Sequence, residues 1–276
     1  MRLTAGFLLA PIVVLMAFPA TPEYSIEAVR YGTLPQFPVS GLVLGAPATE
    51  KLDIALMFWL IRSEDRAILL DTGFHREKWF KSFKITDFVR PDEAVRQAGV
   101  DPAQISDVIL SHAHWDHMGG IDLFPNATIW IQKEEFAYFM GPAWQEGGKN
   151  GGIDPEDLSV LLLRNIQRKL KLIDGDDCEI IPGIRVFTGA RHTAASQYIR
   201  VDGNPVFVLA SDNCYLYRNL ETRTAIPTFE AGDRDSNLKA LDRMVTLAGA
   251  PERVVPGHDP RVFTRFPTKD RIAKIK

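Results

Sequence analysis

Residues 106–120, SDVILSHAHWDHMGG, gather metal-binding side chains at the end of an apolar run. Three of the six histidines of the chain, His112, His114 and His117, lie here together with Asp116. His112 and His114 occupy positions i and i+2 of an extended strand end, whereas Asp116 and His117 begin a helical turn. The side chains therefore leave this turn in two directions. Zinc and related ions take three or four nitrogen or oxygen ligands, so four donors arranged in this way predict two ions, provided that other segments supply further ligands.

Three single donors elsewhere in the chain complete this pattern. His192 lies in GARHTAA, Asp212 in LASDNCY and His258 in VVPGHDP. Each follows a β-forming run and is therefore expected to project from the edge of a sheet. A lone histidine is more often an ordinary core or surface residue than a ligand. Imidazoles and a carboxylate crowded at one strand end, however, are hard to satisfy without a cation. Only His75 stays outside this constellation.

Short β-forming runs alternate with helical patterns along the chain. The runs are bounded by Gly, Pro, Asp or Asn and comprise residues 25–31, 53–62, 67–71, 107–110, 127–132, 179–187, 197–201, 206–210 and 253–255. A turn at 202–205, DGNP, is expected to join two of them. Helices are predicted for 92–98, for 155–172 and for a run from Ser236, its expected N-cap, to Leu247. The chain is therefore expected to be an α/β protein with sheets covered by helices, in one catalytic domain over 21–276.

The N-terminal segment differs from the rest of the chain. Residues 5–18 form a 14-residue apolar run behind Arg2. This run is short for a bilayer span but has the length of a secretion-signal core. We therefore expect residues 1–20 to be a signal peptide, which would make the protein periplasmic or secreted, although the cleavage site is poor. The alternatives are an uncleaved membrane anchor, which would be the only contact with a membrane, and a buried N-terminal segment.

The overall composition is that of an ordinary globular protein, with 46% hydrophobic and 24% charged residues. A net charge of −3 gives no basic surface, so no nucleic-acid partner is expected. Cys178 and Cys214 do not make a disulfide framework and are expected to be two buried free thiols rather than a bridge. The sequence is compatible with a homodimer.

The motif HxHxDH after a strand, followed by single His, Asp and Gly-His segments, resembles the metallo-β-lactamase superfamily. LLDTG at 69–73 is similar to that family's early strand-turn signature. The resemblance implies an αββα sandwich with the site where the two sheets meet at one edge. It further implies that one metal is held by His112, His114 and His192, a second by Asp116, His117 and His258, with Asp212 bridging both and Asp71 orienting a ligand imidazole.

One position departs from the family. Arg191 stands where these proteins usually have Gly before the histidine, and Ala194-Ala195 follow where a small or Pro-Gly pair is usual. Two orientations are open for this bulky side chain: it points away from the metals, or it neutralises an anionic product.

Two divalent ions about 3.5–4 Å apart can share a hydroxide, because each lowers the pKa of bound water. Such a hydroxide attacks a carbonyl or phosphorus centre, so hydrolysis is the expected chemistry. Asp116 could take the proton of the nucleophile and deliver it to the leaving alkoxide. Zinc is the expected metal, although iron, cobalt and manganese also suit these ligands.

Comparison of Asp212 and Tyr215 with subfamilies of this superfamily narrows the range of expected substrates. Lactamases proper generally lack the bridging aspartate. Glyoxalase II-type thioesterases add a glutathione-binding region for which little chain remains after His258, and redox di-iron relatives have glutamate in place of His114. DNCY, residues 212–215, is similar to the N-acyl homoserine lactonases, in which a tyrosine three residues after the aspartate reaches the substrate carbonyl. A phenol there can donate a hydrogen bond to the developing oxyanion.

We therefore expect a lactone or ester as substrate and an N-acyl homoserine lactone as the best match. A phosphotriester or aryl ester hydrolase and a non-catalytic metal-binding module are the alternatives. The glycine-rich stretch 139–154 suggests a mobile loop over a pocket. An apolar wall for an acyl chain could come from Phe136, Phe139, Met140, Trp144 and Phe229, although such aromatic stripes more often belong to a core.

Overall fold

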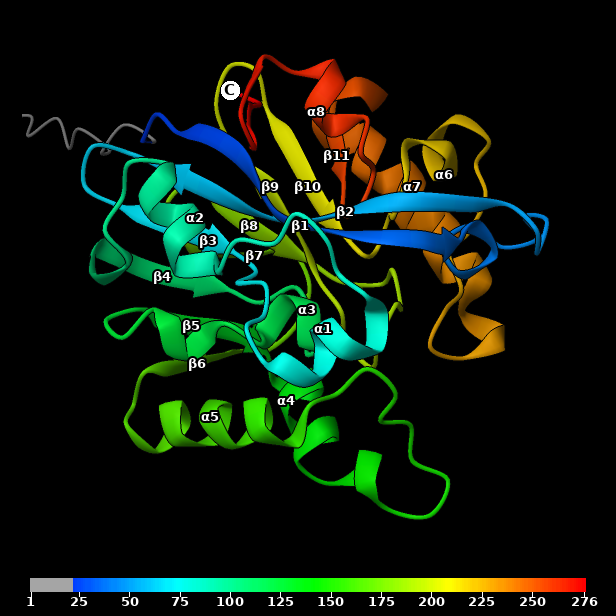
Figure 1. Ribbon diagram of the computed structural model, residues 1–276, viewed down its shortest axis with the longest axis horizontal. Coiled ribbons are helices and arrows are strands. Elements are labelled where there is room, and N and C mark those ends of the chain that lie inside the picture. The colour runs from blue at the N-terminus through cyan, green and yellow to red at the C-terminus, as the bar shows by residue number, and fades with distance from the viewer. Residues whose placement is uncertain (1–21) are drawn as a thin grey trace, which may run out of the picture.

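The computed structural model describes residues 22–276, which form two β-sheets packed face to face (Figure 1). The first sheet has eight strands in the order β12-β13-β1-β2-β3-β4-β5-β6, and the second has five in the order β11-β10-β9-β8-β7. The first sheet consists of β1 (Ser25–Pro38), β2 (Lys51–Arg62), β3 (Ala67–Leu70), β4 (Ile105–Ile109), β5 (Thr128–Gln132), β6 (Leu170–Ile173), β12 (Thr268–Lys269) and β13 (Ile272–Lys274). The second consists of β7 (Cys178–Ile181), β8 (Ile184–Phe187), β9 (Tyr198–Val201), β10 (Phe207–Ser211) and β11 (Val254–Pro256).

Strand β2 shows why the sheets pack in this way. Its side chains alternate between the two faces of the sheet, as in any strand. Phe58 and Leu60 pack toward the helices, whereas Trp59 and Ile61 pack between the two sheets. All four are fully buried. The strand is therefore apolar on both faces, which requires a covering layer on each side.

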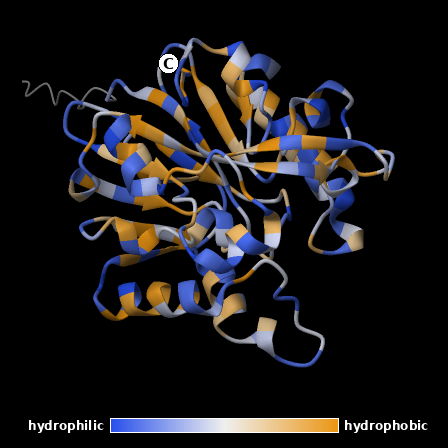
Figure 2. Cartoon of the chain, viewed as in Figure 1, coloured by the Kyte–Doolittle hydropathy of each residue, from blue (hydrophilic) through white to orange (hydrophobic). Residues whose placement is uncertain are grey.

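Helices cover the outer face of each sheet. The first sheet shares a core with α1 (Glu77–Phe83), α2 (Pro91–Gln97), α3 (Trp115–Met118), α4 (Lys133–Met140) and α5 (Pro155–Ile166). The second sheet is covered by α7 (Arg234–Ala248), while α6 (Tyr217–Glu221) and α8 (Val262–Arg265) each contribute one fully buried residue to the core between the sheets. In Figure 2 the strands are largely hydrophobic, whereas the helices are mixed. This order of layers confirms the predicted αββα sandwich.

The structure corrects three predicted elements. Residues 179–187 contribute to two strands, because Gly183, at a left-handed φ of 79°, turns the chain back between β7 and β8. The helix predicted to reach Leu172 ends at Ile166, and its last apolar residues belong to β6. Ser236 is not an N-cap, since α7 already begins at Arg234 and the Ser236 hydroxyl donates to a main-chain carbonyl. The turn at 202–205 does join β9 to β10.

The predicted signal peptide or anchor, residues 1–20, lies outside the described residues. That assignment, the localisation and the homodimer stay predictions. Over residues 22–276 no helix has both the length and the apolar character needed to cross a membrane. Both cysteines are free, as expected, but only Cys214 is buried and Cys178 is half-buried.

Candidate metal centre

Four loops, at the ends of β4, β8, β10 and β11, bring together the seven predicted metal-binding residues. Their donor atoms form two sets, and within each set the atoms lie within 4.8 Å of one another. The first group comprises His112, His114, His192 and Asp212, and the second group comprises Asp116, His117 and His258.

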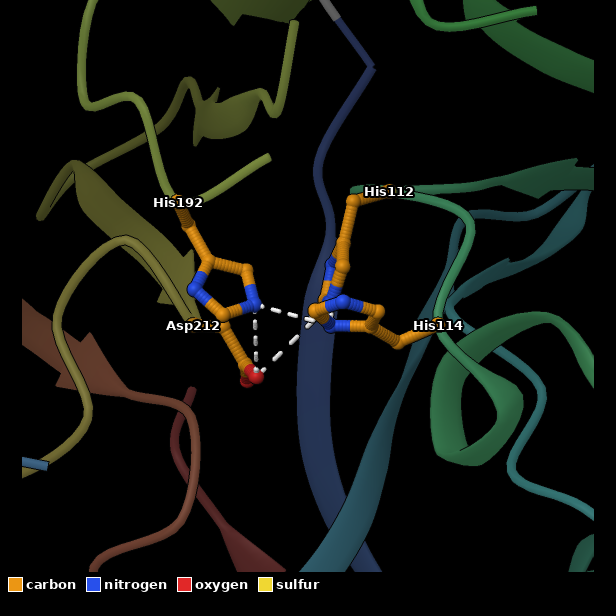
Figure 3. Close-up of side chains that lie close together, drawn as sticks. All are labelled: His112, His114, His192 and Asp212. Atoms are coloured by element: carbon orange, nitrogen blue, oxygen red, sulfur yellow. Dashed lines mark hydrogen bonds and ion pairs between the residues drawn. The ribbon is translucent and has the colours of Figure 1, made fainter. Parts of the chain in front are cut away.

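The first group is built from three imidazoles and one carboxylate oxygen (Figure 3). Nδ1 of His114 lies 2.8 Å from Nε2 of His112 and 2.9 Å from Nε2 of His192. Oδ2 of Asp212 lies 3.4 Å from the same His192 nitrogen. Four donor atoms therefore point toward one another from three separate loops.

The second group faces the other oxygen of Asp212. Oδ1 of Asp212 lies 3.2 Å from Nε2 of His117 and 2.9 Å from Nε2 of His258. Oδ2 of Asp116 lies 3.6 Å and 3.7 Å from these two nitrogens. One carboxylate thus presents an oxygen to each group.

These residues fit divalent metal ions. Nε2 of His117 and Oδ1 of Asp212 are buried and have no hydrogen-bond partner, although they are only 3.2 Å apart. Nδ1 of His258 donates to the Ala55 carbonyl at 2.8 Å, which leaves the lone pair of its Nε2 free and facing Oδ1 of Asp212. Buried donors and acceptors are normally satisfied, and a cation between these atoms would satisfy them.

The pKa values of the histidines separate the two groups. Burial lowers the pKa of His112 well below its usual value, that of His114 to about 4 and that of His192 to about 3, so these imidazoles are neutral. Burial also acts on His117 and His258, but the carboxylates of Asp212 and Asp116 outweigh it and raise both pKa values.

Asp71, which the resemblance implied as an orienting residue, connects to both groups. Its Oδ2 accepts hydrogen bonds from Nδ1 of His117 and from the hydroxyls of Ser111 and Ser211, each at 2.8 Å. Because the Ser111 hydroxyl donates to Asp71, the Nδ1–H of His112 donates to Ser111 Oγ, also at 2.8 Å. Both histidines are thereby fixed with Nε2 free to bind a metal.

Tyr215 lies between the two groups. Its hydroxyl is 3.3 Å from Nδ1 of His192, and its ring stacks on that of His258 at 5.8 Å between centroids. Burial raises the pKa of Tyr215 well above its usual value, and nearby carboxylates add to this effect. The phenol therefore keeps its proton and can act as a hydrogen-bond donor.

A cavity of about 340 Å³ opens onto His114 of the first group, Asp116 and His258 of the second group, Asp212 and Tyr215. Its apolar wall consists of Leu34, Phe37, Leu42, Ile54, Phe83 and Trp115. Among the described residues that line it, none is lysine or arginine. Trp115, inside HAHWDH, is the one wall residue whose place in the motif could have indicated its role. The cavity suits an uncharged ligand with an apolar part.

The aromatic residues predicted for this wall do not line the cavity. Phe139, Met140 and Trp144 line a separate surface pocket against α5, and Phe136 and Phe229 pack elsewhere. The core placement that the sequence favoured for such a stripe holds for Phe139, which is buried. The wall instead combines residues of β1, β2 and α1 with Leu42 and Trp115.

Two further expectations concern loops beside the site. The Arg191 side chain donates to the carboxylate of Asp233 at 3.2 Å and to the carbonyl of Ala194, so it does not reach the ligands. Gly152, at the end of the glycine-rich stretch, lines the cavity, and a Cβ there would lie 2.8 Å from the His114 ring. This part of the stretch therefore does lie over the site.

The sequence profile of the metallo-beta-lactamase superfamily matches residues 57–258. N-acyl homoserine lactonase AttM of Rhizobium johnstonii is 30% identical over 181 residues, which cover 63% of this chain and 65% of AttM. The structure of an AiiA mutant from B. thuringiensis, with N-decanoyl-L-homoserine at its active site, has a TM-score of 0.73 at 21% identity. That match covers 90% of this chain and 98% of AiiA. AidC, a dizinc quorum-quenching lactonase, has a TM-score of 0.63 at 19% identity and covers 88% of this chain and 90% of AidC. These structural matches show the fold.

Proposed function

Since the chain belongs to the metallo-beta-lactamase superfamily, we propose that it is a metal-dependent hydrolase that opens the lactone ring of N-acyl homoserine lactones. Curated relatives such as AttM are named for this substrate, and the chain spans 65% of AttM. One observation carries the proposal. A single carboxylate, Asp212, presents an oxygen to each of two ligand groups beside a cavity with an apolar wall.

The first group would hold one divalent ion and the second group another, with Asp212 shared. Zinc suits this mixture of imidazole and carboxylate ligands. When bound, such a pair of ions supplies an activated water as nucleophile and polarises the carbonyl that it attacks.

Asp116 is the candidate for moving the proton. Ring opening forms a bond from the water oxygen to the carbonyl carbon and breaks the bond from that carbon to the ring oxygen. The proton of the water must then reach the departing alkoxide. The Asp116 carboxylate lines the cavity, and burial raises its pKa, so it can hold that proton during the transfer. The product carries one carboxylate and one hydroxyl.

Tyr215 is the candidate for stabilising the oxyanion. Its hydroxyl lies at the cavity between the two groups and keeps its proton. A neutral donor held in a buried site favours the charge that develops on the carbonyl oxygen.

The apolar wall is the candidate for binding the acyl chain. Five of its residues, Leu34, Phe37, Leu42, Ile54 and Phe83, carry no polar side-chain group. An anionic substrate would meet no lysine or arginine among the described lining residues, which favours a neutral lactone.

Proton release at constant pH tests the proposal with N-acyl-L-homoserine lactones of short, medium and long acyl chains. We expect metal-dependent ring opening that improves as the chain fills the apolar wall. A phosphotriester and an aryl ester serve as the comparison substrates. Faster turnover of either would assign the alternative hydrolase. Metal binding without hydrolysis of any lactone, ester or lactam would indicate a non-catalytic metal-binding module.

A further inference from the structure

Glu135 is a buried carboxylate outside the two ligand groups. It lies in the first turn of α4, and its side chain is fully buried. Oε1 accepts hydrogen bonds from the Ala113 amide at 3.1 Å and the Thr193 hydroxyl at 2.7 Å. Oε2 accepts one from the Ala195 amide at 2.7 Å. Both carboxylate oxygens are therefore used.

The three donors lie on the loops that carry the histidines of the first group. Ala113 lies between His112 and His114, and Thr193 directly follows His192. One side chain thus ties together the two loops that supply all three imidazoles. The segment of Ala113 also carries Asp116 and His117 of the second group, but these two lie beyond it in α3, and none of the three donors belongs to the loop of His258.

We infer that Glu135 is a positioning residue that sets the metal affinity of the first group. The inference rests on the metal centre proposed above. Glu135 makes none of these bonds to a predicted ligand side chain. It acts by fixing the distance between the two loops that carry the three imidazoles. Partners that orient ligands in this way typically contribute about 10–100-fold to metal affinity.

A neighbouring cross-link shows that the charge of Glu135 is not needed simply to join the loops. Nε2 of Gln132 donates to Oε1 of Gln197 at 2.9 Å, and Nε2 of Gln197 donates to the Leu110 carbonyl at 2.7 Å. Neutral amides therefore connect the same two loops further from the ligands.

A buried carboxylate is costly unless it is compensated. Among residues 22–276 no lysine, arginine or histidine forms an ion pair with Glu135. Its hydrogen bonds come from neutral donors only, and burial raises the pKa of Glu135 to about 7. A cation held between the loops that it joins would favour this negative charge.

The test is zinc affinity, measured by competition with a chromophoric chelator, after Glu135→Gln is introduced into two backgrounds. His258→Ala leaves the first group intact, and His192→Ala leaves the second group intact. Gln keeps the size of the side chain but turns an N–H toward the Ala195 amide. We expect zinc binding to weaken about 10–100-fold in the His258→Ala background and to stay unchanged in the His192→Ala background.

Glu134→Gln is the matched control, because Glu134 is the preceding residue of α4 and its side chain is 72% exposed. It should leave zinc affinity unchanged in both backgrounds. Equal weakening by Glu135→Gln in both backgrounds, or no weakening in either, would overturn the inference. If Glu135→Gln does not fold, Thr193→Val removes one of the three donors and must show the same selectivity with a smaller shift. Wild-type protein that binds fewer than two ions would instead contradict the proposed metal centre itself.

Discussion

The two groups of candidate ligands differ in charge and in the way they are held. The first group offers three imidazoles and one oxygen of Asp212, whereas the second offers two imidazoles, the Asp116 carboxylate and the other oxygen of Asp212. In the first group His112 and His192 contact hydroxyls, His114 bonds to the main chain of Gly151, and all three lie on loops joined by Glu135. Histidines of the second group donate to a carboxylate, Asp71, and to the carbonyl of Ala55.

The two groups therefore form two different electrostatic environments side by side. Burial lowers the pKa values of the first-group histidines, and carboxylates raise those of the second group. The first group is therefore a set of neutral nitrogens with a single anionic ligand, and the second is more anionic. Asp212 belongs to both groups, so replacing it should weaken metal binding by both.

Asp212→Ala should have the largest effect. Both groups lose a ligand, so we expect the zinc content to fall below one ion per chain and lactone opening to fall by more than the roughly 10–100-fold that loss of an outer partner causes. Metal analysis and the rate of ring opening check this. Asp242→Ala, at an exposed ion pair, is the control. Retention of two ions would show that the carboxylate is not shared.

Tyr215→Phe should separate chemistry from metal binding. Tyr215 contacts a histidine of each group but is not itself one of the candidate metal ligands. We expect kcat to fall by about 10²–10³-fold, as for loss of an oxyanion donor, with unchanged zinc content. Loss of metal in this variant would mean that the phenol supports His192 rather than the substrate.

Asp71→Asn should weaken zinc binding by both groups, whereas a change at Glu135 should weaken it only in the first group. The carboxylate receives a hydrogen bond from His117 directly and is linked to His112 through Ser111. We expect zinc affinity to fall about 10–100-fold in both the His192→Ala and the His258→Ala backgrounds. Weakening confined to one background would show that Asp71 serves a single group.

Replacement of zinc by manganese should give the smallest effect. Carboxylate ligands suit Mn²⁺ better than imidazoles do. The preference for zinc over manganese should therefore be larger in the His258→Ala protein, which keeps the first group, than in the His192→Ala protein. Competition titrations measure both ratios. Equal zinc-to-manganese ratios in the two proteins would contradict the electrostatic difference between the groups.

The sequence was sufficient to predict which candidate ligands the fold brings together. Imidazoles placed directly after strands have few other roles, and the fold brings these strand ends to one edge. The resemblance of LLDTG likewise implied that Asp71 orients a ligand imidazole, and its carboxylate accepts a hydrogen bond from His117. The β-forming runs alternating with helical patterns predicted sheets covered by helices, whereas the αββα order of layers was implied by the resemblance to the family. Leu170 and Leu172 fitted a helix as well as the strand that they form.

The cavity wall and the outer supports could not be predicted in this way. Leu34 and Phe37 in β1 and Phe83 in α1 reach the site only through packing between distant elements. Hydrophobicity marks such residues as buried but does not identify their neighbours, so the sequence could not decide whether Phe139 and Trp144 line the site, and they do not. Glu135 follows another glutamate in KEEF and looks like an exposed helical residue until the fold buries it.

If the proposed function is correct, two ions held by the two groups are needed to open a lactone ring. The most direct measurement titrates metal-free protein with zinc while ring opening of an N-acyl homoserine lactone is followed in the same sample. We expect no activity without metal and a rise in activity that ends when two ions per chain are bound. Full activity with one ion or none, or no ring opening with two ions bound, would contradict this expectation.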